Sequence, residues 1–107
     1  MVKMDTYLFL VTVPNFEVAK KVARILVEHK LAACVNIIQN VFSIYQWKNN
    51  IQEDTELLLF IKTTEEKCNS IIQKIKEIHP YEVPECIGFK IEKGLEKYLN
   101  WIQEVVK

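Results

Sequence analysis

The sequence predicts an α+β sandwich in which helices pack against a four-stranded sheet. Four segments rich in apolar, β-branched and aromatic residues are interleaved with three segments whose apolar residues recur at helical spacing. The chain has 107 residues with only two glycines and three prolines, which leaves little room for a linker. We therefore expect a single domain over residues 1–107.

The first strand and helix follow directly from the N-terminal pattern. Tyr7–Val13 is apolar, rich in β-branched and aromatic residues, and stops at Pro14, so it is expected to form a buried strand. Asn15 suits the N-cap of a helix, because its side chain can accept a hydrogen bond from a free backbone N–H of the first turn. The apolar residues that follow it predict a helix at Phe16–His29.

A long hairpin is expected next. Leu31–Trp47 is strand-like, but Gln39-Asn40 interrupts its apolar pattern and predicts a bulge or kink. Lys48-Asn49-Asn50 is a turn signal, and Ile51–Lys62 returns as the second strand of the hairpin. Strands of this length would extend beyond a small domain.

The projecting end of that hairpin carries two aromatic side chains, Tyr45 and Trp47. Large apolar groups gathered on an exposed surface usually mark a contact site. We therefore expect a partner, most simply another copy of the chain, to cover them. The acidic residues Glu53, Asp54 and Glu56 are expected to keep the second strand soluble.

The second half of the chain repeats the order of the first. Thr63 and Glu66 have the spacing of a capping box, and the apolar stripe that follows predicts a helix at Glu65–His79. Glu85–Ile91 is the fourth expected strand, and Leu95–Val106 is a last helix with one apolar face.

This element order predicts the topology. A β-α-β-β-α-β sequence of elements forms a ferredoxin-like sandwich from two split β-α-β units, here with a long hairpin between the second and third strands and an extra C-terminal helix. Right-handed crossovers give the strand order 4-1-3-2, with all neighbouring strands antiparallel.

The charge composition excludes several classes of function. Fourteen basic and fourteen acidic residues cancel, so no nucleic-acid partner is expected. Arg24 is the only arginine, which argues against phosphoryl transfer because arginine is the usual bidentate ligand of phosphate. No serine or cysteine lies in a nucleophile motif, and we expect neither an enzyme nor an organic cofactor.

The terminus and the cysteines bear on the compartment. The N-terminal apolar run is too short to cross a membrane and is followed by no cleavage signal, so we expect no membrane partner. The three cysteines, Cys34, Cys68 and Cys86, include no CxxC pair, which argues against a disulfide framework or a structural zinc site. These features predict a cytoplasmic protein.

The segment His79–Glu85, HPYEVPE, is the most distinctive in the chain. Its two prolines keep the backbone stiff and extended. Such a connector either turns the chain sharply from helix to strand or holds His79, Tyr81, Glu82 and Glu85 in fixed directions for a ligand. The sequence leaves both alternatives open.

Five strings in order along the chain resemble the CutA family of divalent-cation tolerance proteins. They are LAACVNII (Leu31–Ile38), SIYQW (Ser43–Trp47), IQEDTE (Ile51–Glu56), HPYEVPE (His79–Glu85) and YLNWI (Tyr98–Ile102). The resemblance implies a homotrimer with the hairpins and the last helix in its contacts, a link to copper and other divalent cations, and an architecture similar to PII signalling proteins. It implies no defined reaction.

Copper favours thiolate and imidazole ligands, which makes His79, Cys34 and Cys86 the candidate ligands, with Glu82 as a further carboxylate. The predicted topology places Cys34 at one end of the sheet and Cys86 and His79 at the other, so a site would be weak or shared between subunits. In some bacterial CutA proteins the ligands include a cysteine in the first strand and a histidine pair. Val11 and Ile78 occupy the corresponding positions here.

A PII-like sensor of small molecules is the alternative function. Its pocket would lie between subunits, with the HPYEVPE residues His79, Tyr81, Glu82 and Glu85 on one side. A neighbouring hairpin would close the pocket with Tyr45, Trp47 and Lys62.

Overall fold

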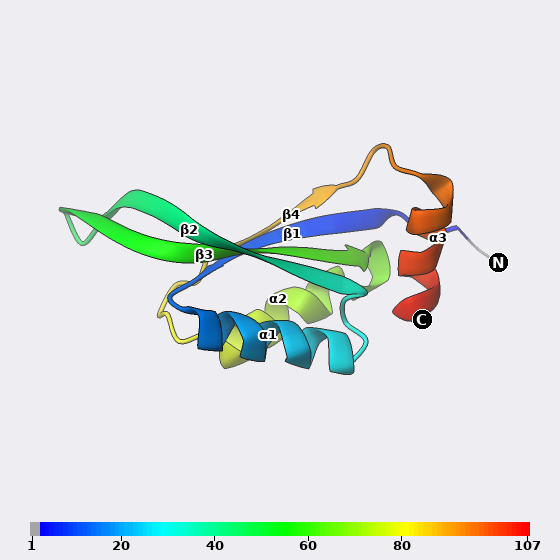
Figure 1. The fold of residues 1–107 in the computed structure, drawn as a ribbon, viewed down its shortest axis with the longest axis horizontal. Coiled ribbons are helices and arrows are strands. Elements are labelled where there is room, and N and C mark those ends of the chain that lie inside the picture. The colour runs from blue at the N-terminus through cyan, green and yellow to red at the C-terminus, as the bar shows by residue number, and fades with distance from the viewer. Residues whose placement is uncertain (1–2) are drawn as a thin grey trace.

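A computed structural model describes residues 3–107 and shows one sheet with two helices on one face and a third helix at one end (Figure 1). The elements are β1 (Thr6–Val13), α1 (Phe16–Glu28), β2 (Cys34–Trp47), β3 (Asn50–Thr64), a 3₁₀ turn (Glu65–Lys67), α2 (Cys68–Ile78), β4 (Cys86–Lys90) and α3 (Glu96–Val105).

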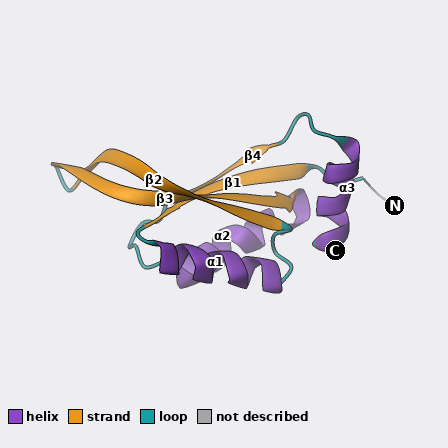
Figure 2. Cartoon of the chain, in the orientation of Figure 1, coloured by secondary structure: helices purple, strands orange, loops and turns teal. Residues whose placement is uncertain are grey.

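The sheet confirms the predicted topology. Its strand order is β2-β3-β1-β4, and all three pairings are antiparallel (Figure 2). Strand β3 is the longest, pairing with β2 over most of its length and with β1 only from Leu57 to Thr64. The α+β ferredoxin-like prediction, including the long hairpin and the additional helix, is therefore confirmed.

The main core lies between the sheet and the helices α1 and α2. One face of β1 and β3 supplies alternate residues that are almost fully buried, as expected when every second side chain of a strand points the same way. The buried apolar residues of this core are Phe9, Val11, Val13, Ala19, Val22, Leu26, Ala32, Leu57, Leu59, Ile61, Ile71 and Ile75.

Local signals at the start of α1 act as predicted, whereas its end differs. The Asn15 side chain accepts a hydrogen bond from the Val18 N–H at 2.9 Å. At the other end Lys30 has a positive φ of 57°, and the Leu31 N–H returns to the Leu26 carbonyl at 2.9 Å. Because the residues after His29 form this helix-ending turn, β2 begins at Cys34 and not at Leu31.

The hairpin projects from the sandwich, as its length predicts. The residues of β3 before Leu57 do not pair with β1. Over this part the paired β2 and β3 continue past the helices in Figure 1. The molecule accordingly measures 50 × 25 × 22 Å along its principal axes. A tight two-residue turn closes the hairpin, with Lys48 and Asn49 at positive φ.

The predicted bulge is present. The register between β2 and β3 shifts between Ile38 and Val41, and Asn40 has a φ of 63°. A residue in the left-handed region increases local twist and re-aims the strand beyond it. The bulge therefore sets the direction in which the projecting part of the hairpin leaves the sandwich.

The capping box predicted at Thr63 and Glu66 is wrong. Thr63 is fully buried in β3 opposite Tyr7, and its hydroxyl donates to the Leu31 carbonyl at 2.6 Å. The strand thus runs two residues further than expected. A 3₁₀ turn then precedes α2, which starts at Cys68 without a side-chain cap.

Helix α3 lies across the end of the sheet, near the start of β1 in Figure 1. Ile102 is buried in a second, smaller cluster with Ala33 and Val106. The expected apolar face is covered only in part, because Leu95 and Tyr98 at its other end are exposed. Tyr98 instead packs on the exposed Trp101, with ring centroids 5.5 Å apart.

The bulge provides a test of the fold. Asn40 is exposed, so its substitutions report mainly on its backbone conformation. Asn40→Val should lower the free energy of unfolding by about 1–2 kcal/mol, because a β-branched residue is disfavoured at positive φ. Urea unfolding at fixed protein concentration measures the change. Asn40→Gly is the matched control and should match the wild type or exceed it; equal stability of the two variants would contradict the bulge conformation.

Candidate functional site

His79 ends α2 with both ring nitrogens engaged by the chain itself. Its Nε2 donates to the Thr12 carbonyl at 2.7 Å, and its Nδ1 accepts the Tyr81 N–H at 3.1 Å. The side chain is only 7% exposed. These two hydrogen bonds require a neutral imidazole with its proton on Nε2. They tie the start of the HPYEVPE segment to the end of β1.

Tyr81 continues this connection toward the hairpin. Its ring packs against that of His79 with centroids 4.7 Å apart, and its hydroxyl donates to Glu56 Oε2 at 2.7 Å. Glu56 is only 6% exposed. The expectation that Glu56 keeps the strand soluble is therefore wrong, because Tyr81 of the HPYEVPE segment covers Glu56 beside the end of β1.

Tyr45 and Asp54 form a second phenol–carboxylate pair further out on the hairpin. The Tyr45 hydroxyl donates to Asp54 Oδ2, and this pair is exposed. Asp54 and Glu56 are two residues apart on β3, so their side chains lie on the same face of the hairpin. One face of the hairpin thus presents two carboxylates, each held by a phenol from a different element.

The pKa values of both phenols are raised. Burial is the main cause at Tyr81, followed by its hydrogen bond to the Glu56 carboxylate. At Tyr45 the main cause is the hydrogen bond to Asp54. In both pairs a phenolate would face a carboxylate, and like charges disfavour ionisation. The two tyrosines therefore act as neutral hydrogen-bond donors over the ordinary pH range.

The structure separates Lys62 from this cluster. Lys62 lies six residues further along β3 than Glu56, which corresponds to about 20 Å of extended strand. Its ammonium group contacts the Cys34 Sγ at 3.8 Å and donates to Asn36 Oδ1. Within a single chain, the predicted pocket residues His79, Tyr81 and Tyr45 lie near one another. Lys62 lies near the end of β3 that is away from the hairpin tip.

The remaining predicted pocket residues lie at the surface. Trp47 is near the hairpin tip, with the Lys48 ammonium 5.7 Å from its ring centroid. Glu82 and Glu85 flank Pro84 and are exposed. Neither carboxylate is part of the phenol–carboxylate cluster.

Two of the predicted copper ligands, Cys34 and Cys86, lie on the two opposite edge strands of the sheet. Cys34 is on β2 and Cys86 is on β4, so three strand spacings, about 14 Å, separate them. Cys86 pairs with Val11, and burial raises the pKa of its thiol to about 11. Within residues 3–107 no three His, Cys, Asp or Glu side chains gather in a metal-binding arrangement.

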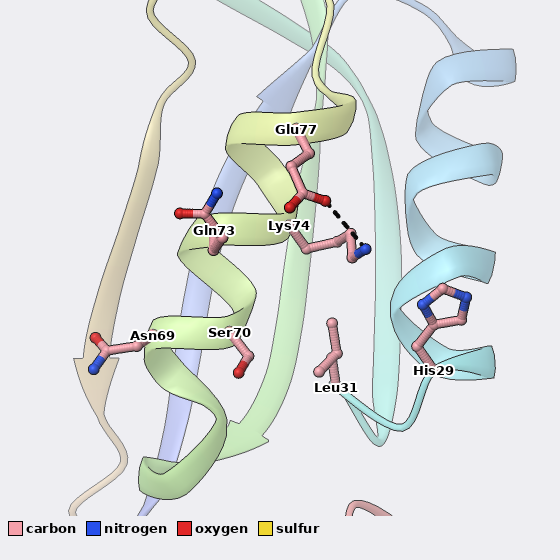
Figure 3. Close-up of a pocket in the computed structure, with 7 residues that line it drawn as sticks. All are labelled: His29, Leu31, Asn69, Ser70, Gln73, Lys74 and Glu77. Carbon is pink, nitrogen blue, oxygen red and sulfur yellow. Dashed lines mark ion pairs between the residues drawn. The ribbon is translucent and has the colours of Figure 1, made fainter.

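A solvent-open groove lies between the end of α1 and the face of α2 (Figure 3). An ion pair from Lys74 Nζ to Glu77 Oε2, 3.2 Å long, crosses part of it. The lining residues are His29, Leu31, Asn69, Ser70, Gln73, Lys74 and Glu77. It contains none of the predicted site residues, and its polar side chains resemble an ordinary helix surface.

The sheet face opposite the helices is apolar, a feature that the sequence-based predictions do not include. Ile87 and Phe89 on β4 are about half exposed on this face. Their strand partners there are Leu10 and Leu8, both partly exposed. The signal was present in the sequence, because β1 and β3 are apolar at every position over several residues, and such strands are normally covered on both faces.

The projecting hairpin has a second apolar surface, on the side away from Tyr45. Phe42, Ile44 and Ile51 are each at least 60% exposed there. They are more exposed than Tyr45 and Trp47, the two aromatic residues that the sequence predicts to need a covering partner. No helix within residues 3–107 is long and apolar enough to cross a membrane.

Comparison with known proteins gives a consistent set of relatives. The family model of the CutA1 divalent ion tolerance protein matches residues 7–105. A "Protein CutA homolog" of Xenopus laevis is 51% identical over 96 residues, which is 90% of this chain and 64% of the relative. The "Divalent-cation tolerance protein CutA" of Thermus thermophilus is 46% identical over 95 residues, covering 89% and 92% of the two chains.

A solved structure shows the same fold. The crystal structure of CutA from Xylella fastidiosa superposes with a TM-score of 0.94 at 36% identity, covering 96% of this chain and 99% of that one. The chain spans less than two thirds of the length of two animal CutA proteins, at 64% of the Xenopus protein and 55% of the mouse protein.

The contact between Tyr81 and Glu56 gives a stability test. Tyr81→Phe should lower the free energy of unfolding by about 1–3 kcal/mol, because it leaves a buried carboxylate without its donor. Tyr45→Phe is the matched control, since its carboxylate partner is exposed, and it should change stability much less. Equal effects of the two substitutions would contradict the structural role of the Tyr81 contact.

The same contact predicts a pH dependence. Because the pKa of Tyr81 is higher in the folded state, its contribution is complete below the ordinary phenol pKa of about 10 and is lost as the pH rises toward the folded-state pKa. Denaturant unfolding from neutral pH to above pH 10 should show a steeper loss in the wild type than in Tyr81→Phe. Parallel curves would contradict the assignment.

Proposed function

The chain belongs to the CutA1 divalent ion tolerance family, and on this premise we propose that it supports tolerance of divalent cations as a homotrimer, without catalysing a reaction. The observation that carries the proposal is the amount of apolar surface that one chain leaves uncovered. It comprises the sheet face around Ile87 and Phe89 and the hairpin surface around Phe42 and Ile44.

The position of these surfaces favours self-association. The open sheet face and the hairpin surface lie on opposite faces of one sheet. By register Phe42 and Ile44 share the face of the buried Leu57, and the hairpin carries them beyond the helices that cover this face (Figure 1). Large contiguous apolar patches on soluble proteins usually mark protein contacts. A closed ring of identical copies covers such surfaces in every copy at once.

The proposed cation site does not fit within a single chain. Both His79 nitrogens are engaged, and Cys86 is half-buried against the core. The Lys62 ammonium lies against Cys34, which opposes a second positive charge there. Our proposal therefore places copper or another divalent cation between copies, where exposed groups such as Glu82 meet donors of a neighbour, and implies weak or assembly-dependent binding.

A small-molecule sensor is the second candidate function. The favouring observation is the pair of phenol–carboxylate contacts on one hairpin face, Tyr81–Glu56 and Tyr45–Asp54, which hold polar groups in fixed directions beside the exposed Trp47. In this variant a neighbouring copy would contribute Lys62. A thermal-shift screen of common metabolites, run beside one of divalent cations, separates the two functions, since a ligand of the native state raises its melting temperature.

For the compartment we propose the cytoplasm. All three cysteines are free in the structure, and reduced thiols are typical of cytosolic proteins.

Two isoleucines with nearly equal exposure test the assembly. Ile87 on the open sheet face is 47% exposed, and Ile72 on α2 is 46% exposed. Ile87→Glu should convert the trimer to monomers, because a carboxylate would be buried in the contact. Ile72→Glu should leave the trimer intact. Light scattering at micromolar concentration measures both. A monomeric wild type, or equal dissociation by both variants, would overturn the proposed assembly.

Copper titration tests the shared cation site. Wild-type protein should bind copper with an affinity that is lost in Ile87→Glu, because the ligands then no longer meet. Glu82→Gln should weaken binding in the intact trimer, whereas Cys68→Ser is the control and should not. A tight site retained by the monomeric variant would refute binding between copies.

A further inference from the structure

Cys34, Asn36 and Lys62 form a polar cluster at the base of the hairpin, away from the Tyr81 site. Cys34 and Lys62 are directly opposite partners in the antiparallel register of β2 and β3. The Lys62 Nζ lies 3.8 Å from the Cys34 Sγ and also donates to Asn36 Oδ1. Asn36 Oδ1 is itself 4.0 Å from the sulfur. An ammonium group and a thiol are thus held side by side on two hydrogen-bonded strands.

The surroundings of Cys34 differ from those of the other two cysteines. Cys86 and Cys68 pack against the main core, and burial raises the pKa of both thiols. Of the three cysteines, Cys34 is the one beside a lysine ammonium.

We propose that Cys34 and Lys62 are a redox modification site in which peroxide oxidation of the thiol is followed by a covalent sulfur–nitrogen link between β2 and β3. This site is independent of the proposed cation binding. It would fasten the base of the hairpin covalently on the open sheet face, in the same row across the sheet as Leu8 and Phe89.

The chemistry balances with hydrogen peroxide as the only oxidant. Peroxide converts the Cys34 thiol to a sulfenic acid, R–SH + H₂O₂ → R–SOH + H₂O, in which sulfur loses two electrons and the O–O bond breaks. Lys62 gives a proton to water, and its amine attacks the sulfur: R–SOH + R′–NH₃⁺ → R–S–NH–R′ + H₂O + H⁺. The S–N bond forms, the S–O bond breaks, and water leaves. Sulfenic acids condense with a backbone nitrogen to form a sulfenamide, and the proposed step is the same displacement by a side-chain amine.

Geometry favours Lys62 over a thiol as the partner. Cys34 and Cys86 lie on β2 and β4 with two strands between them, and Cys68 is on α2 in the helix layer. The Lys62 amine is already in contact with the sulfur. A link between directly opposite residues of neighbouring strands requires only side-chain rotation, because such positions are the closest across a sheet.

Mass spectrometry of the assembled protein after peroxide treatment tests the proposal. Trypsin should release one peptide pair joined through Cys34 and Lys62, lighter by two hydrogen atoms than the sum of its parts and separated by a thiol reductant. The product should be lost in Cys34→Ser and in Lys62→Arg, which keeps the positive charge but removes the primary amine. It should persist in the Cys68→Ser/Cys86→Ser double variant.

A second readout distinguishes the link from simple thiol oxidation. In Lys62→Arg the sulfenic acid should accumulate, so labelling of Cys34 by dimedone should increase over the wild type. Wild-type protein without the joined peptides would overturn the proposal. So would equal dimedone labelling of Cys34 in the two proteins, or preferential oxidation of Cys68 or Cys86.

Discussion

The end of β1 at Val13 is the constraint on which the rest of the structure depends. From Leu57 to Thr64, strand β3 has a neighbouring strand on each side and helices beneath it. From Asn50 to Glu56, β3 pairs only with β2, and its other edge is open. The chain therefore divides at one residue into a packed sandwich and a projecting hairpin. An open strand edge usually needs protection, and here the HPYEVPE segment provides it at Glu56 through Tyr81.

This junction connects features that are far apart in the sequence. His79 fixes the segment to the last residues of β1 through the Thr12 carbonyl, and Tyr81 fixes it to Glu56, the residue next to the end of the pairing between β3 and β1. The segment bends at residues 80–83 and does not run extended as its prolines predict, and this bend lets both side chains reach their partners. The segment is thus both a corner and a holder of polar groups. The alternatives that the sequence left open are two aspects of one arrangement.

The sequence was sufficient for the fold because the signals were local and agreed with one another. Strand and helix periods, the Asn15 cap, the Asn40 bulge and the right-handed crossover rule all indicated the same topology. Contacts between side chains that are distant in the sequence were harder to predict. Glu56 looked like one of three solvated acids, because its burial depends on a tyrosine 25 residues later in the chain. Thr63 matched a capping box, yet register with β1 kept it in the strand.

The same reasoning explains why the predicted copper ligands and pocket residues only partly meet. Residue type identified His79, Cys34 and Cys86, but each position is already committed locally, to hydrogen bonds, to an ammonium neighbour or to the core. A side chain with satisfied partners must give them up before it can bind an ion, and that exchange lowers affinity. Exposed groups without such commitments lie on the hairpin and around Pro84. If function requires several donors at once, it must draw them from more than one copy, so assembly and binding become linked properties of this fold.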